Sequence, residues 1–113
     1  MSALVLLTDL IGKWQGTNHL WLSPEKPVHK SESSADIRTA MQAQFNEIRY
    51  SWAEDNKPQE GRLILGQDSG SKAVKAVWFD TWHMMEQFMV CEGSVEAGAF
   101  SVQGSYVVKS GPD

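Results

Sequence analysis

Apolar and polar residues alternate along almost the whole chain after Gly12, and this alternation constrains the fold more than any other feature of the sequence. A period of two is typical of β-strands that bury one face, because successive side chains point to opposite faces of a strand. It is clearest where Ile48, Tyr50 and Trp52 alternate with charged or hydroxyl side chains. Seven segments show the pattern, namely residues 13–22, 31–41, 44–54, 61–67, 72–83, 88–95 and 100–109.

The connections between these segments are short and contain turn residues, as in Asp55–Pro58, Asp68–Ser71 and Glu96–Gly98. Short connections join antiparallel neighbours, so we predict an all-β antiparallel meander that curls into a barrel, a partial barrel or a sandwich. A length of 113 residues allows one core and leaves no room for a second folding unit. We therefore expect a single domain over residues 1–113.

The start of the chain departs from the β pattern. Leu4, Leu7, Leu10 and Ile11 fall at helical spacing, and Gly12 follows where a left-handed C-cap glycine is expected. This predicts a short amphipathic helix over residues 3–11 that docks on the body of the domain. A helix for a membrane surface or a partner is the alternative, but no basic residues flank it.

Composition excludes several classes of protein. Ten Lys and Arg against fourteen Asp and Glu give a net charge of −4, with no basic cluster of the kind that binds nucleic acid. The single cysteine excludes a disulfide framework and fits a reducing compartment. The apolar start is too short to span a bilayer and lacks the features of a signal peptide. We therefore expect a cytoplasmic protein that binds neither nucleic acid nor membrane.

Three sequence tracts carry a resemblance to a known group of proteins. The opening Gly12-Lys13-Trp14-Gln15-Gly16 resembles the G-x-W start of calycin barrels, which include the lipocalins, the fatty-acid-binding proteins and the nitrobindin-like proteins. A second tract at residues 21–25 and 29–33, and a third at residues 78–84 and 91–93, are similar to an uncharacterised bacterial family with that barrel. The resemblance implies a calycin-like β-barrel with an internal cavity and no settled biochemical activity.

The end of the chain departs from that family. Related chains continue past a turn such as Ser110–Asp113 with further strands, and a late Arg or Lys packs over the opening Trp, where this sequence offers only Lys109. With seven predicted strands, the chain is about three short of a barrel of roughly ten. The first and last strands would then be open edges, so we expect a homodimer that pairs through them.

Aromatic residues on the predicted strands suggest a site for a small apolar or aromatic ligand inside the barrel. Side chains of this size line such cavities, although they also fill the cores of small barrels. In the latter case the protein would be an assembly module with a filled core. Asn18 is the one polar residue of the first strand that we place inward. The predicted ligand-binding residues are Trp14, Asn18, Tyr50, Trp52, Trp78, Trp82 and His83.

An enzyme of hydrolase or isomerase type is the alternative, with His83 acting together with Asp80 or Glu92. Asp80 and His83 are three residues apart and would lie on opposite faces of a regular strand unless a bulge at Trp82 intervenes. A surface histidine beside a surface carboxylate is the simpler interpretation, and Cys91 is more typical of a small buried residue than of a nucleophile. We therefore assign no catalytic residue.

We expect no metal and no cofactor, because the histidines and the cysteine lack the spacing of metal ligands. Haem is the alternative that remains open. It would need an axial histidine on the cavity wall, for which His83 is the best candidate, with Met84 or Met85 nearby.

Overall fold

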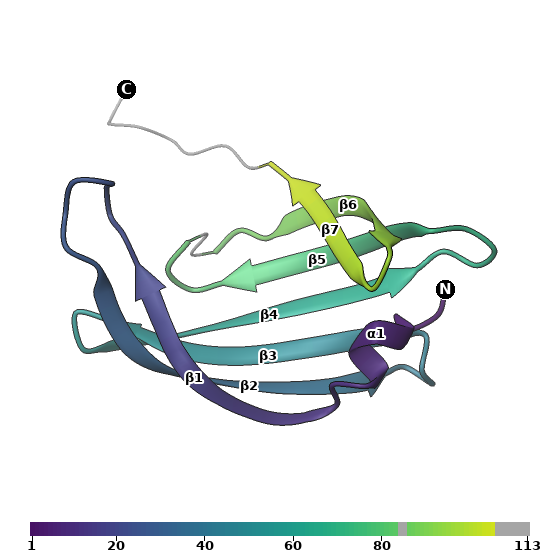
Figure 1. Ribbon diagram of the computed structural model, residues 1–113, viewed down its shortest axis with the longest axis horizontal. Coiled ribbons are helices and arrows are strands. Elements are labelled where there is room, and N and C mark those ends of the chain that lie inside the picture. The colour runs from purple at the N-terminus through teal and green to yellow at the C-terminus, as the bar shows by residue number, and fades with distance from the viewer. Residues whose placement is uncertain (84–85, 106–113) are drawn as a thin grey trace.

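The computed structural model describes residues 1–83 and 86–105, and it contains one short helix and one antiparallel sheet (Figure 1). The strands pair in chain order from β1 to β7, and the sheet curls into a half-barrel. The all-β antiparallel meander is therefore confirmed. The elements are α1 (Val5–Thr8), β1 (Gly12–Leu20), β2 (His29–Ala40), β3 (Phe45–Glu54), β4 (Lys57–Gln67), β5 (Ala73–Asp80), β6 (Met89–Glu96) and β7 (Ala99–Gly104).

The hairpin between β3 and β4 is tighter than the sequence predicted. Asp55 and Asn56 have φ values of 52° and 60°, so the turn has two residues, both in the left-handed region, as in type I′ hairpins. Pairing starts at once between Glu54 and Lys57, four residues before the predicted strand of residues 61–67. Pro58 is tolerated there because β5 pairs with β4 only from Gly61 onward.

Helix α1 is shorter than predicted. It ends at Thr8, and Leu10 and Ile11 are exposed, so the part of the prediction that buried them on a helix spanning residues 3–11 is wrong. Gly12 is the first residue of β1 rather than a helix cap. The indole of Trp14 donates a hydrogen bond from Nε1 to the carbonyl of Leu10 at 2.8 Å, which holds this segment as a lead into β1.

The core lies between α1 and one face of the sheet, which we name the inner face. Leu4 and Leu7 of α1 pack with buried residues of β4, β5 and β6, namely Leu65, Val74, Ala76, Met89 and Cys91. Asn46 is fully buried, and its Oδ1 accepts a hydrogen bond from the backbone N–H of Leu4 at 2.7 Å. The opposite face of the sheet is the outer face.

Strands β1 and β7 lie at the two ends of the sheet order, and in the described part of the chain they do not pair with each other. The open half-barrel expected from the sequence is therefore present. The predicted last strand of residues 100–109 corresponds to β7, while its residues 106–109 lie outside the described residues together with the Ser110–Asp113 turn.

Candidate functional site

Five residues form a straight row across the inner face. The strand register places Trp14, Ala35, Tyr50, Gly61 and Asp80 opposite one another on β1 to β5. Gly61 is needed in this row because a Cβ atom at that position would lie 2.1 Å from Cζ and Oη of Tyr50. The Tyr50 ring therefore lies over β4, and its hydroxyl donates a hydrogen bond to Oδ2 of Asp80 at 2.6 Å.

Trp78 extends this contact into a chain of hydrogen bonds. Its Nε1 donates to the Tyr50 hydroxyl at 2.7 Å, so that the hydroxyl accepts one bond and donates another. Tyr50 is on β3, whereas Trp78 and Asp80 are on β5. The network thus joins two strands that are separated by β4.

Asp80 is the last residue of β5, and its side chain stabilises the turn that follows the strand. Its Oδ1 accepts hydrogen bonds from the backbone N–H groups of Trp82 at 2.9 Å and His83 at 2.8 Å, which is the pattern of an Asx turn. Nδ1 of His83 lies 2.8 Å from the same oxygen. The predicted strand of residues 72–83 therefore stops at Asp80, and the expectation that Asp80 and His83 lie on opposite faces is wrong. So is the interpretation of Asp80 as a surface carboxylate, since it is 3% exposed.

The network shifts the pKa values of Asp80 and Tyr50. Burial alone would raise the pKa of Asp80, but hydrogen bonds from Tyr50, His83 and Trp82 outweigh it, and the pKa lies below its ordinary value of 3.8. Burial, followed by the hydrogen bond to Asp80, raises the pKa of Tyr50. Asp80 is thus an ionised acceptor near neutral pH, and Nδ1 of His83 carries the proton that it shares with Asp80. In the neutral imidazole, Nε2 is then the acceptor nitrogen.

Three tryptophans surround the His83 ring, and we name Trp52, Trp78, Trp82 and His83 the Trp–His cluster. The ring centroids of Trp82, Trp78 and Trp52 lie 4.9, 5.5 and 5.7 Å from that of His83. Trp52 also meets Trp82 edge to face at 5.7 Å. Trp52 is 5% exposed, and its Nε1 is buried without a hydrogen-bond partner among the described residues. The His83 side chain is 34% exposed, so the cluster reaches the surface.

Other predicted residues lie apart from this cluster. Trp14 shares the inner face but is 48% exposed and two strands away from Tyr50. Asn18 is half-buried further along β1, opposite Ser31. Within residues 1–83 and 86–105, no hydrogen bond or aromatic pair joins either residue to the cluster. Strands β2, β3 and β4 lie between β1 and β5 in the sheet order.

The remaining candidates are also separate from His83. Glu92 lies on the outer face, opposite Lys75, so the alternative that pairs it with His83 is wrong. Cys91 is buried, as predicted, and burial raises the pKa of its thiol, which disfavours the reactive thiolate. Met84 and Met85 lie outside the described residues. Among the residues that are described, no group of three or more His, Cys, Asp or Glu side chains could hold a metal ion.

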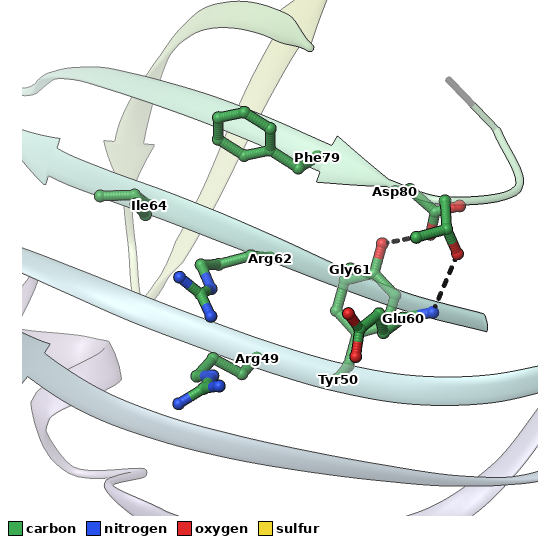
Figure 2. A pocket seen from close by; sticks show the side chains of 9 residues that line it. Arg49, Tyr50, Glu60, Gly61, Arg62, Ile64, Phe79 and Asp80 are labelled. Atoms are coloured by element: carbon green, nitrogen blue, oxygen red, sulfur yellow. Dashed lines mark hydrogen bonds between the residues drawn. The ribbon is translucent and has the colours of Figure 1, made fainter. Parts of the chain in front are cut away.

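A feature missed by the sequence interpretation is a groove of about 430 Å³ over β3, β4 and β5 (Figure 2). Tyr50 and Asp80 contribute to its lining, but no tryptophan of the Trp–His cluster does. Arg49 and Arg62 lie in it and are directly opposite each other. A sequence signal existed, because a two-residue turn at Asp55 and Asn56 brings these arginines into register, whereas the predicted four-residue turn hid the pairing.

Fold and site together define a class of protein, an open antiparallel half-barrel with an aromatic cluster on its inner face. The chain belongs to the family described as "Protein of unknown function (DUF1579)", which matches residues 4–112. Neither the curated proteins nor the solved structures contain a match to the chain, so the relation to calycins stays a prediction. No helix among the described residues has the length and apolar character required to cross a membrane.

Proposed function

We propose that this protein binds a small apolar or aromatic ligand at the Trp–His cluster on the inner face. The observation that carries the proposal is the gathering of three indole rings around one imidazole whose orientation is fixed by the buried Asp80. Indoles offer large flat apolar surfaces, and a few convergent polar groups orient a ligand among them.

Two polar atoms of the cluster define the hydrogen bonds that the ligand would make. Nε2 of His83 accepts a hydrogen bond when Nδ1 donates to Asp80. The N–H of Trp52 is buried without a partner among the described residues, a costly state that a bound acceptor relieves. The proposed ligand is therefore an aromatic or alicyclic body with one hydroxyl or amide group, which both donates and accepts.

A filled core is the competing explanation, and a binding experiment separates the two. The neutral dye N-phenylnaphthylamine, followed by fatty acids, flavins and phenols, would be titrated against the chain by intrinsic fluorescence and calorimetry. Trp82→Ala should weaken binding about tenfold, because an aromatic contact and its buried area are lost. Trp21→Ala is the matched control, since Trp21 is exposed in the connection between β1 and β2. A flat response to the whole panel would contradict the proposal.

Acid–base catalysis is the second candidate, favoured specifically by the 2.8 Å contact between Nδ1 of His83 and the buried Asp80. A carboxylate that orients an imidazole in this way leaves Nε2 to take a proton from a substrate. If a reaction is found, His83→Gln should abolish turnover while ligand binding through the indoles persists. Turnover that survives this change would exclude His83 as the base.

We also propose that two copies associate through the edge of β1, whose outward backbone groups have no strand partner among the described residues. Light scattering at micromolar concentration should give the mass of a dimer, against 12.6 kDa for one chain. A monomer over this range would contradict the association.

A further inference from the structure

Two arginines, Arg49 and Arg62, face each other on neighbouring strands of the outer face, where a pair of opposite charges would be more stable. Arg49 of β3 and Arg62 of β4 are directly opposite each other across the strand pair, an arrangement that destabilises a sheet when the charges are alike. Glu47 offsets the repulsion, with Oε1 lying 3.7 Å from Nε of Arg49 and 3.5 Å from Nε of Arg62. On the neighbouring strand β2, Asp36 is directly opposite Arg49 and pairs with Arg38, and Glu60 also lies in the groove. The charges on this face therefore balance, and what the groove offers an anion is the unused hydrogen-bond donors of the two guanidinium groups.

The outer ends of both guanidinium groups are available. The ion pairs with Glu47 involve only the Nε atoms, and no hydrogen bond within residues 1–83 and 86–105 uses an Nη atom of either arginine. Both side chains are about half exposed, at 50% and 45%. Paired guanidinium groups with free Nη atoms match the geometry of a carboxylate, which accepts two parallel hydrogen bonds.

An apolar surface continues from the arginines in the same groove. Phe79 of β5 is directly opposite Arg62, and Ile64 of β4 lies on the same face. Phe79 is 41% exposed and has a second aromatic ring, that of Phe88, 5.5 Å away. Figure 2 shows the two guanidinium groups side by side, with Ile64 and Phe79 on one side of them and the carboxylate of Glu60 toward Tyr50.

We propose that this groove binds an organic monoanion, a carboxylate attached to an aromatic or alkyl body. The carboxylate lies between the Nη atoms of Arg49 and Arg62, and the body packs on Phe79 and Ile64. A volume of about 430 Å³ is within the range of small-ligand sites. Glu60 repels a second acidic group, so a dicarboxylate of similar size is disfavoured. The site is distinct from the Trp–His cluster and does not depend on the function proposed for it.

Titration of the isotope-labelled chain with phenylbutyrate, followed by NMR, tests the proposal. The side-chain Nε–H signals of Arg49 and Arg62 should shift in a saturable way. Arg62→Gln should weaken the affinity at least tenfold, because a charge-assisted hydrogen bond to the anion is lost. Lys75→Gln is the matched control and should stay within twofold, since Lys75 is a cation on the outer face of β5, opposite Gly66 and Glu92, and does not line the groove. Unchanged affinity in Arg62→Gln would overturn the proposal.

Three further probes separate the parts of the site. Phenylbutanol, which lacks the charge, should bind at least tenfold more weakly, and equal binding would overturn the role of the arginines. Inorganic phosphate should bind more weakly than phenylbutyrate, and equal binding would overturn the role of Phe79. Terephthalate should bind weakly to the natural chain and better to Glu60→Gln, and the absence of that gain would overturn the assigned selectivity.

The location of the shifts distinguishes this site from the inner face. Shifts confined to the indole N–H signals of Trp52, Trp78 and Trp82 would mean that phenylbutyrate binds at the Trp–His cluster, which would overturn the outer-face site and support the other proposal. Urea unfolding of each variant verifies that it is folded before its affinity is compared.

Discussion

Replacing Gly61 by alanine should disturb the hydrogen-bond network without touching any of its polar groups. The new Cβ atom would lie 2.1 Å from the Tyr50 ring, far inside van der Waals contact, so the ring must leave its place above β4. That movement separates the Tyr50 hydroxyl from Asp80, now 2.6 Å away, and from Nε1 of Trp78, now 2.7 Å away.

The size of the effect follows from those two contacts. A hydrogen bond to a charged group contributes about 1.5–3 kcal/mol, and a partly buried N–H left without a partner costs about 1–3 kcal/mol. Because the displaced ring remains partly solvated, we expect a loss of about 2–4 kcal/mol in the free energy of unfolding. With an m-value of about 2 kcal/mol/M, the urea midpoint should fall by about 1–2 M.

Urea unfolding monitored by tryptophan fluorescence measures this loss, with Gly16→Ala as the control. Gly16 is also in a strand, β1, but a Cβ atom there meets nothing within 4 Å, so the midpoint should hardly move. In a Tyr50→Ala background, Gly61→Ala should cost less than about 0.5 kcal/mol, since the clash is gone. An equal cost with and without the Tyr50 ring would refute the reasoning.

Three further changes have defined outcomes. Asp80→Asn should lower the free energy of unfolding at neutral pH. The difference from the natural chain should shrink as the pH falls through the folded-state pKa of Asp80, which is below 3.8. Urea midpoints from pH 7 downward measure this difference, and a difference that stays constant would contradict the lowered pKa of Asp80. The natural chain should lose stability above pH 10, because the pKa of Tyr50 is raised in the folded state and the tyrosine ionises more readily in the unfolded chain. Tyr50→Phe should reduce this loss. Equal losses of the free energy of unfolding in the two proteins above pH 10 would contradict the raised pKa. Gln42 has a φ of 58°, a left-handed conformation that glycine adopts more readily than glutamine. Gln42→Gly should therefore raise the free energy of unfolding by about 0.5–1 kcal/mol and the melting temperature by about 2–8 °C. Gln44→Gly, outside the left-handed segment, should raise neither, and calorimetry compares the two variants.

The strands were predictable because their signal is local. Alternation of apolar and polar residues places Tyr50, Trp52 and Trp78 on one face without knowledge of their partners. The contact between Asp80 and His83 was predicted only as an alternative, because a carboxylate that binds the backbone ahead of it ends a strand, and alternation carries no information about that competition. Asp80 at the end of an apolar run was the available sign.

Distances across the sheet were harder to predict than faces. Trp14 is on the same face as Tyr50, as expected, but separation on that face depends on the number of strands between two residues and on the curl of the sheet. The opposition of Arg49 and Arg62 depends on the length of one turn, so an error of two residues there concealed it.

The position of the Tyr50 ring above Gly61 also affects which strand register forms during folding. A strand that slips by two residues keeps its apolar face inward, so burial alone discriminates poorly against that error. Such a slip of β4 would bring Gln59 or Leu63 beneath the ring in place of Gly61, and the ring could no longer reach Asp80. The lack of a side chain at Gly61 thus favours the native register of β3, β4 and β5 over a two-residue slip. This matters in a sheet whose described strands do not close into a barrel.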